Sequence, residues 1–360
     1  MFFFTVIAWS FMSGEYGWSG LLSDGDCGLH IRIGDYIVAN GRVPMIDIFS
    51  FSRPGQEWFA FEWGSEVIYS LLNAAFGLKG VVLLAGLVIA GVFTVLLRYT
   101  IWLGSNGLIA LVLVLMGINA TSIHFHARPH IFTLLFMVIA IWMLEADRRH
   151  RSRVVWLLVP LTVVWTNLHG GFLILFALMG LLVAGRLAES FLWSEESVRG
   201  RSDALRYALL GAACAAASLL NPYGIKLHLH IRETMQSKTI MANVQEFLAP
   251  TFRSEAYLHY TALLFLALML SGMLLRRRRL VEVLWILFLG ASSLYSARHV
   301  PLFALMAVPL IALELSDLWT RWMRSQSRKS VACVLDDVAS QLQDKWQANS
   351  LWLPAGIAAL

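Results

Sequence analysis

"KGVVLLAGLVIAGVFTVLLR", residues 79–98, is an apolar run bounded by a lysine and an arginine. An α-helix needs about 20 apolar residues to cross the ~30 Å hydrocarbon core of a bilayer, and this run has that length. Further apolar runs lie at residues 1–13, 106–123, 128–146, 153–169, 171–190, 204–220, 257–275, 280–297 and 299–317. The sequence therefore predicts an all-α, polytopic helical membrane protein with about 10–11 transmembrane helices.

The composition agrees with a membrane protein. Hydrophobic residues make up 58% of the 360 residues and charged residues only 14%, whereas soluble domains average about 25% charged residues. A membrane β-barrel is not indicated, because it requires alternating segments of ~10 residues. The net charge of +5 gives no indication of a nucleic-acid partner, and Cys27, Cys214 and Cys333 lack the spacing of a metal site or a disulfide framework.

Basic residues predict which ends of the helices face the cytoplasm. They concentrate at 147–153, 276–279, Arg199 to Arg206, and Arg321 to Lys329, and such loops remain on the cytoplasmic side. The segments that then face outward are 14–78, 124–130, 167–171, 221–256 and 296–299. These segments hold most of the histidines. We therefore expect a multi-pass protein of the cytoplasmic (inner) membrane whose site faces the periplasm or exterior.

The segment 61–77 has two possible interpretations. It is either an eleventh span, or an amphipathic helix lying on the outer surface. The surface helix is favoured, because an additional span would place the basic segment 276–279 outside. Glu62 and Glu66 lie one turn apart on one face of this helix.

Two parts of the chain follow from these boundaries. Residues 1–317 are predicted to form one transmembrane domain, with the outer loop 14–78 holding helices beside the membrane. Residues 318–360 are predicted to form a cytoplasmic tail with an amphipathic helix at 330–346. The terminal sequence LWLPAGIAAL resembles the beginning of a further span.

The outer loop contains an unusually acidic segment for so apolar a chain. Asp24 and Asp26 precede a predicted helix at 26–40, in which Asp26 and His30 share one face. The apolar stripe of this helix is predicted to be Leu29, Ile33, Tyr36 and Ile37. The two aspartates suit a general base, a divalent-cation site for Mg²⁺ or Mn²⁺, or a simple helix cap. Asp35 and Asp47 lie beside turns and are predicted to be structural.

Other outward motifs combine cationic and polar side chains. Arg128 and Arg298 lie at helix starts, where a charge normally faces a polar cavity, and arginine suits phosphate through its fork of donors. Interfacial anchoring is the alternative for both. His124, His126 and His130 form a weak metal pattern. Asn167 and His169 lie at a helix end, Tyr223 lies in an NPYG turn, and His299 follows Arg298. The predicted common location of these residues favours a site that holds a lipid phosphate beside a base.

The ordered motifs resemble those of the GT-C superfamily of integral-membrane glycosyltransferases, and of a bacterial group of GT-C-like proteins within it. The segment "DGDCGLHIRIGDYIVANGRVP" is similar to the acidic first outer loop of that superfamily, in which Asp26 best matches the family aspartate. The residues that match the bacterial group are Asp24, Asp26, His30, Gly34, Pro44, Asp47, Phe49, Ser50, Glu62, Trp63, Arg128, Pro129, Asn167 to Gly171, Asn221 to Gly224, Arg298, His299 and Pro301.

The resemblance implies transfer of a sugar from a polyprenyl-phosphate donor to a glycan, lipid or protein acceptor, with inversion. Asp26 is then the catalytic base, and Asp24 orients the acceptor or shares a divalent metal. Residues expected to bind substrate or phosphate are His30, Arg32, Glu62, His126, Arg128, Asn167, His169, Tyr223, Arg298 and His299. A lipid or solute transporter without chemistry, or a non-catalytic scaffold, remains as the alternative.

Overall fold

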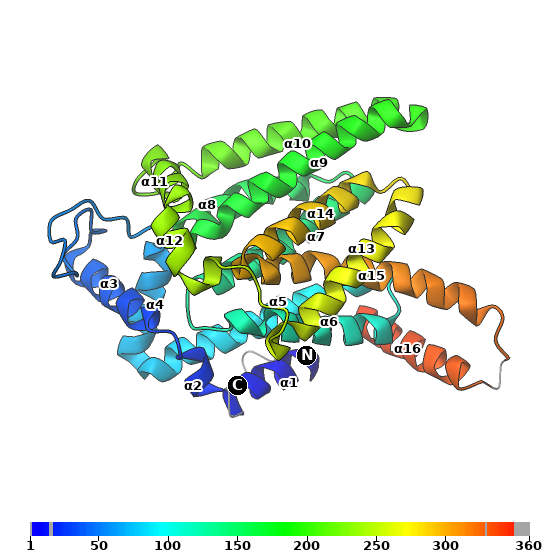
Figure 1. Ribbon diagram of the computed structural model, residues 1–360, viewed down its shortest axis with the longest axis horizontal. Coiled ribbons are helices and arrows are strands. Elements are labelled where there is room, and N and C mark those ends of the chain that lie inside the picture. Colours follow the sequence, from blue (N-terminus) through cyan, green and yellow to red (C-terminus); the bar gives the residue numbers. More distant parts are fainter. Residues whose placement is uncertain (1, 14–16, 328–329, 349–360) are drawn as a thin grey trace. The chain divides into compact units, whose positions relative to one another are not determined.

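The computed structural model describes residues 2–13, 17–327 and 330–348, and its regular elements within these are helices joined by loops (Figure 1). The described residues contain no β-strand beyond one isolated bridge between Ile46 and Glu57. The prediction of an all-α protein is therefore confirmed. Arg328, Lys329 and the terminal segment 349–360, which the sequence assigned to a basic loop and to a further span, lie outside the described residues.

Among the described residues, six helices are long and apolar enough to cross a membrane, which fits a membrane-embedded protein. They span Leu78–Trp102 (α5), Gly107–His124 (with α6, Gly107–Thr121), His130–Arg149 (α7), Gly170–Leu192 (with α9, Leu173–Leu192), Glu255–Arg276 (with α13, Leu258–Arg276) and Ala297–Met323 (with α15, Val300–Met323). Two shorter apolar helices cover Arg153–Leu168 and Leu280–Tyr295. The predicted total of 10–11 crossings stays a prediction.

Charged residues modify one predicted boundary. The run at 204–220 was expected to follow a basic loop at Arg199 to Arg206, but α10 (Ser197–Ala217) already includes those arginines. Charged side chains in the first half of α10 form ion pairs and hydrogen bonds with α7 and α9. The expectation of a loop there was wrong, because the ion pairs described below stabilise a longer helix than hydropathy alone indicates.

The helices group into two compact units. The first unit comprises Met1–Ile7, Ala90–His124 and Ala249–Leu360, and the second comprises Ala8–Ile89 and Phe125–Leu248. The predicted domain boundary near residue 317 stays a prediction.

In the first unit α15 is the most buried helix, and it packs against α6, α13 and α14 (Leu280–Tyr295). The Tyr260 hydroxyl lies 2.9 Å from Ser293 Oγ, and the Tyr260 ring meets Phe303 edge to face. The amphipathic helix predicted at 330–346 is present as α16 (Val331–Ala348). It is tied to α15 where Trp319 Nε1 donates to Asp336 Oδ1 at 2.8 Å.

The second unit contains α3 (Asp26–Asn40), α4 (Trp63–Phe76), α7, α8 (Leu158–Leu168), α9, α10, α11 (Ile225–Gln236) and α12 (Lys238–Asn243). Helix α3 packs along α4, α4 contacts α8, and α9 packs along α10. Helix α2 (Trp18–Leu21) precedes the acidic segment, after α1 (Phe2–Ser13). The long connection between α3 and α4 brings α4 back beside α3, against which it packs.

Helix α3 forms where the sequence predicted it, but its buried face is rotated. Ile33 and Ile37 are buried against α4 and the connection that precedes it, whereas Leu29 is 39% exposed. The inclusion of Leu29 in the apolar stripe was therefore wrong. His30 occupies that position on the buried face instead, at 8% exposure. The helix thus uses part of its buried face for a polar side chain.

Gly34 sets the distance between α3 and α4. A Cβ atom on Gly34 would lie 2.0 Å from the Glu66 carbonyl oxygen and 2.7 Å from Ser70 Cβ. Asp35, the next residue, accepts a 2.7 Å hydrogen bond from the Ser70 hydroxyl. In the connection, Asp47 Oδ1 accepts from the Phe49 and Ser50 N–H groups. These bonds agree with the structural roles expected for Asp35 and Asp47.

A network of ion pairs joins the charged ends of α7, α9 and α10. Asp147 is 1% exposed and accepts bonds from the Arg206 guanidinium, the Tyr207 hydroxyl and the Ser152 N–H group. Arg186 contacts Glu189, Glu196 and Asp203 in the same unit. The basic residues that predicted topology therefore also fix the ends of these helices.

Candidate functional site

Eight charged or polar side chains of the second unit form two groups. The aspartate–arginine cluster consists of Asp24, Asp26, Arg128 and Glu246. The histidine–glutamate cluster consists of His30, Glu62, Glu66 and His169. Six of the eight were predicted from the sequence as site residues, and the fold groups them as described below.

Arg128 lies between the carboxylates of the aspartate–arginine cluster. Its Nη1 atom is 2.8 Å from Asp24 Oδ2, and its Nη2 atom is 3.0 Å from Asp26 Oδ2. Glu246 Oε1 is 4.0 Å from Nη2. The carboxylate of Asp26 is the most accessible, since its side chain is 53% exposed against 22% for Asp24 and Arg128. One guanidinium therefore faces three carboxylates.

Backbone contacts bring these distant residues together. The Ala127 N–H group donates a 2.7 Å hydrogen bond to the Leu21 carbonyl, which places the chain before α7 beside the chain before α3. Asp24 Oδ1 accepts from the Asp26 N–H group at 2.9 Å, at the first residue of α3. Asp24 thus accepts a bond at the start of the helix, in agreement with the capping role that was one of three alternatives from the sequence, and it also forms an ion pair.

The surroundings fix the charge state of Asp24 and Arg128. Burial opposes ionisation of Asp24, but the Asp26 N–H bond and the positive charge of Arg128 lower the pKa of its carboxyl group below the usual value. Burial also opposes the charged form of Arg128, yet Glu246, Asp24 and Asp26 raise its pKa. Both groups are therefore ionised at neutral pH. His126 adjoins them, with its Nδ1 atom 3.4 Å from Ser23 Oγ.

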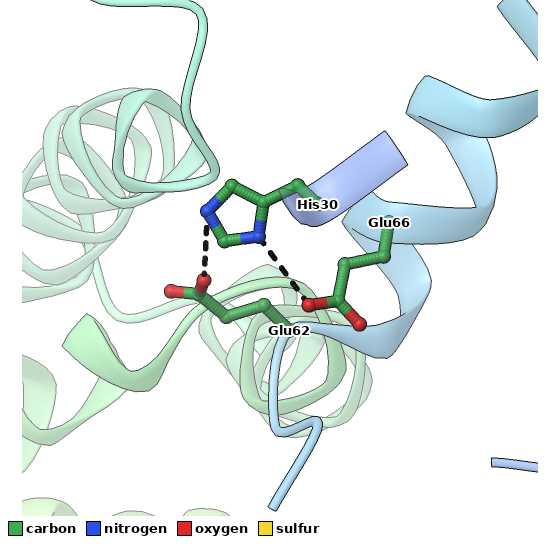
Figure 2. Close-up of side chains that lie close together, drawn as sticks. All are labelled: His30, Glu62 and Glu66. Carbon is green, nitrogen blue, oxygen red and sulfur yellow. Dashed lines mark hydrogen bonds and ion pairs between the residues drawn. The ribbon is translucent and has the colours of Figure 1, made fainter. Parts of the chain in front are cut away.

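His30 is enclosed by two glutamates, as Figure 2 shows. Its Nδ1 atom lies 3.3 Å from Glu66 Oε1, and its Nε2 atom lies 3.6 Å from Glu62 Oε2. His30 projects from α3, Glu66 from the first turn of α4, and Glu62 immediately precedes α4. The side chains are 10%, 3% and 13% exposed for His30, Glu66 and Glu62. The cluster is therefore mostly shielded from solvent.

His169 holds the other oxygen of Glu62. Its Nε2 atom lies 3.3 Å from Glu62 Oε1, while its Nδ1 atom accepts a 2.9 Å bond from the Gly171 N–H group. The Thr133 hydroxyl is 2.7 Å from the same Nδ1 atom and itself accepts from Trp165 Nε1. Because Nδ1 is an acceptor, neutral His169 bears its proton on Nε2 and donates it to Glu62.

The pKa shifts in the histidine–glutamate cluster have opposing causes. Burial lowers the pKa of His30, but the Glu66 hydrogen bond and the charges of Glu62 and Glu66 raise it overall. Burial raises the pKa of Glu66, and the contact with His30 offsets part of this rise. The charge of Arg128 also acts on His30. The two clusters therefore lie close enough to interact electrostatically.

Other predicted site residues have different surroundings. Asn167 accepts from Trp63 Nε1 at 2.7 Å and donates to the Val163 and Leu220 carbonyls. The Tyr223 hydroxyl accepts from the Ala60 N–H group, and burial raises its pKa to about 12. Both side chains therefore hold backbone segments around Glu62.

Three further predicted residues, besides Asn167, Tyr223 and His126, belong to neither cluster. Arg32 is exposed and lies on a different face of α3 from His30. Arg298 and His299 belong to the first unit, at the start of α15, where His299 Nδ1 donates to the Ser292 carbonyl at 3.1 Å. Their predicted role in holding a phosphate stays a prediction.

Two members of the clusters, and one residue that contacts them, were not predicted as site residues. Glu66 had a visible signal, since it shares a helical face with Glu62. Glu246 had none, because it lies in a short 3-10 helix, Gln245–Phe247, whose sequence has no recognisable pattern. Thr133 is an ordinary apolar-helix residue in the sequence, and only its contact with His169 gives it a role.

Potential metal ligands converge at one place in the described residues. The group of three that can each offer a ligand atom within 4.8 Å of the others is His30, Glu62 and Glu66. Between Asp24 and Asp26, where the sequence allowed a metal, the guanidinium of Arg128 contacts both carboxylates. His126 and His130 contact each other through their rings, with centroids 6.5 Å apart.

Comparison with protein families gives no further information on function. No family model matches the chain, and no curated protein matches it. The resemblance to GT-C glycosyltransferases therefore rests on the motifs of the sequence.

Proposed function

We propose that the protein is a membrane glycosyltransferase that moves a sugar from a polyprenyl-phosphate donor to an acceptor hydroxyl. The observation that supports this proposal best is the contact of Arg128 with both Asp24 and Asp26. A base and a phosphate-binding cation must belong to one site for such a transfer, since bond formation and bond cleavage occur on opposite sides of one carbon.

In the proposed reaction Asp26 takes the proton of the acceptor hydroxyl. The acceptor oxygen forms a bond to the anomeric carbon while the bond from that carbon to the phosphate oxygen breaks. The bonding electrons leave with polyprenyl phosphate, and the configuration of the sugar inverts. Asp26 suits this role because its carboxylate is the most exposed of the cluster. Asp24, fixed by the cap of α3, suits orientation of the acceptor.

Arg128 is proposed to bind the donor phosphate. A guanidinium has five N–H donors, so a phosphate can bind while Asp24 stays in place. If the phosphate displaces Asp26 from Arg128, that carboxylate is released from its ion pair and is free to take the proton of the acceptor hydroxyl when the donor is present. The arrangement thus couples donor binding to activation of the acceptor. The sugar and the acceptor are not specified by these contacts.

The test uses purified protein in nanodiscs with a panel of polyprenyl-phosphate sugars and a panel of glycan, lipid and peptide acceptors, and measures release of polyprenyl phosphate. Removal of a general base typically lowers the rate ~10²–10⁴-fold. We expect a loss of this size for Asp26→Asn. The matched control is Glu57→Gln, which removes an acidic side chain that is 64% exposed and outside both clusters, and it should retain wild-type release.

Each outcome has a distinct meaning. Release that survives in Asp26→Asn keeps the transferase but assigns the base elsewhere, to Asp24 or Glu62 first. Binding of the donor lipids without release by wild-type protein contradicts a transferase and favours a lipid transporter. Equal loss in Asp26→Asn and Glu57→Gln indicates a general defect rather than a missing base.

A further inference from the structure

The histidine–glutamate cluster contains buried polar atoms without hydrogen-bond partners, and the proposed sugar transfer does not explain them. In the described part of the chain, His30 Nε2 and Glu66 Oε2 are buried and have no hydrogen-bond partner. His30 as a whole is 8% exposed and Glu66 2% exposed. Buried polar atoms nearly always have partners, so an unsatisfied pair at one place calls for an explanation.

Hydrogen bonds identify which of these atoms are electron donors. His30 Nδ1 faces Glu66 Oε1 at 3.3 Å, so the ring proton of a neutral His30 lies on Nδ1. Its Nε2 atom then presents a lone pair toward Glu62 Oε2, 3.6 Å away. Because His169 donates to Glu62 Oε1, Glu62 is held with its second oxygen toward His30. The lone pairs of His30 Nε2 and Glu62 Oε2 therefore face each other, and the Glu66 carboxylate, beside the other ring nitrogen, offers a third ligand atom within 4.8 Å.

We propose that His30, Glu62 and Glu66 bind one divalent cation of the Zn²⁺ or Mn²⁺ type. The ligand atoms lie within 4.8 Å of one another. With bonds of about 2.1 Å and tetrahedral angles, ligand atoms are ~3.4 Å apart, so rotation of the glutamate side chains closes the remaining distance. Figure 2 shows one carboxylate beside each nitrogen of the imidazole ring, Glu62 at Nε2 and Glu66 at Nδ1.

The donor set selects the kind of cation. One imidazole with two carboxylates suits Mn²⁺ and Zn²⁺, whereas Mg²⁺ prefers oxygen ligands and keeps most of its waters. Two ionised glutamates also compensate the charge of a divalent cation in a buried place. The hydrogen bonds from Thr133 and Gly171 to His169, and from His169 to Glu62, are typical of the outer contacts that orient metal ligands.

The rival explanation is a proton on Nε2, which makes His30 an imidazolium between two carboxylates. Metal titration distinguishes a cation site from an imidazolium. Only the cation site takes up the metal with an affinity that depends on His30, Glu62 and Glu66. The cation site is independent of the proposed sugar transfer, so failure of one leaves the other in place.

The experiment uses the full chain, purified in detergent, stripped with a chelator and exchanged into buffer at neutral pH. Mn²⁺ is added, and free Mn²⁺ is followed by its electron paramagnetic resonance signal, with competition by Zn²⁺. We expect one site per chain in wild-type protein. Loss of an orienting contact already costs 10–100-fold in metal affinity, so Glu66→Gln and Glu62→Gln should each weaken binding by at least about tenfold.

The matched control is Asp26→Asn, which removes a carboxylate from the neighbouring cluster. It should bind Mn²⁺ as the wild type does. The proposal is overturned if wild-type protein binds no Mn²⁺ or Zn²⁺, or if Asp26→Asn loses binding while the glutamate variants retain it. If one glutamate variant is not monodisperse in size-exclusion chromatography, the other glutamate variant supplies the comparison.

Stability provides a second readout that does not depend on activity. A ligand that binds only the folded state raises the unfolding temperature in proportion to the logarithm of its concentration. Zn²⁺ should therefore raise the unfolding temperature of wild-type protein and of Asp26→Asn, but not of Glu62→Gln. Equal shifts in all three would assign the cation to another place and contradict the proposal.

Discussion

At the scale of single residues, the site depends on a glycine that makes no contribution to its chemistry. Gly34 lets α3 approach α4 so closely that the Glu66 carbonyl oxygen lies 2.0 Å from the position of an added Cβ atom. Both helices carry ligands of the proposed cation site, His30 on one and Glu66 on the other. The distance between these helices therefore sets the distance between the two side chains.

Gly34→Ala should destabilise the protein and separate the two helices. Overpacking of a tight contact costs ~1–3 kcal/mol, and here backbone must move, which places the cost at the upper end. The matched control is Gly28→Ala in the same helix, where an added Cβ meets nothing within 4 Å. That change should be neutral or stabilising by up to ~1 kcal/mol, because alanine favours a helix. Thermal unfolding of both variants checks this, and equal midpoints would contradict the close approach.

At the scale of elements, ion pairs decide where several helices end. Asp147 near the end of α7 binds Arg206 of α10 through two donors at 2.9 Å. It also accepts from the Ser152 N–H group at 2.7 Å, which closes the turn after α7. One carboxylate thus joins a helix end, the following turn and a neighbouring helix. Hydropathy alone does not predict this arrangement.

Asp147→Asn should lower stability substantially, since it leaves a guanidinium without its charge partner. Breaking a buried ion pair costs ~3–5 kcal/mol, and the lower end applies because the Arg206 side chain is 24% exposed. Asp337→Asn, at an exposed position of α16, removes the same charge and should change stability little. The measurement is the fraction of monodisperse protein after heating. Equal losses in the two variants would show that the Asp147 network does not stabilise the fold.

At the scale of the whole molecule, the orientation predicted from basic loops can be tested directly. Ser52 lies in the connection between α3 and α4, and Ser325 follows α15; both are exposed. Each is replaced by cysteine in a Cys333→Ser background, because Cys27 and Cys214 are buried. In intact cells a membrane-impermeant maleimide should label Ser52→Cys. It should label Ser325→Cys only after permeabilisation.

The reverse pattern would place the two clusters on the cytoplasmic side, and it would contradict a donor reached from outside. Labelling of both positions in intact cells would instead show that an even number of crossings separates them, whereas the predicted topology requires an odd number. Labelled protein must remain monodisperse, so that exposure through unfolding is not counted as topology.

The sequence by itself determined the helical, membrane-embedded class of the protein. Hydropathy is a local property, so a run such as residues 79–98 specifies an apolar helix without knowledge of its neighbours. The helix at 26–40 was also predictable, because its period and the aspartates before it are local signals. The buried face of this helix was predicted only in part, because Leu29 is exposed and His30 is buried in its place.

Only the tertiary structure decided which polar residues meet. Asp24 and Arg128 are 104 residues apart, and their contact depends on the Ala127–Leu21 backbone bond and the packing around it. Likewise, only the crossing of α3 and α4 at Gly34 makes Glu66 a partner of His30. Each of these contacts joins segments far apart in the chain, and a sequence pattern records only what is close along it.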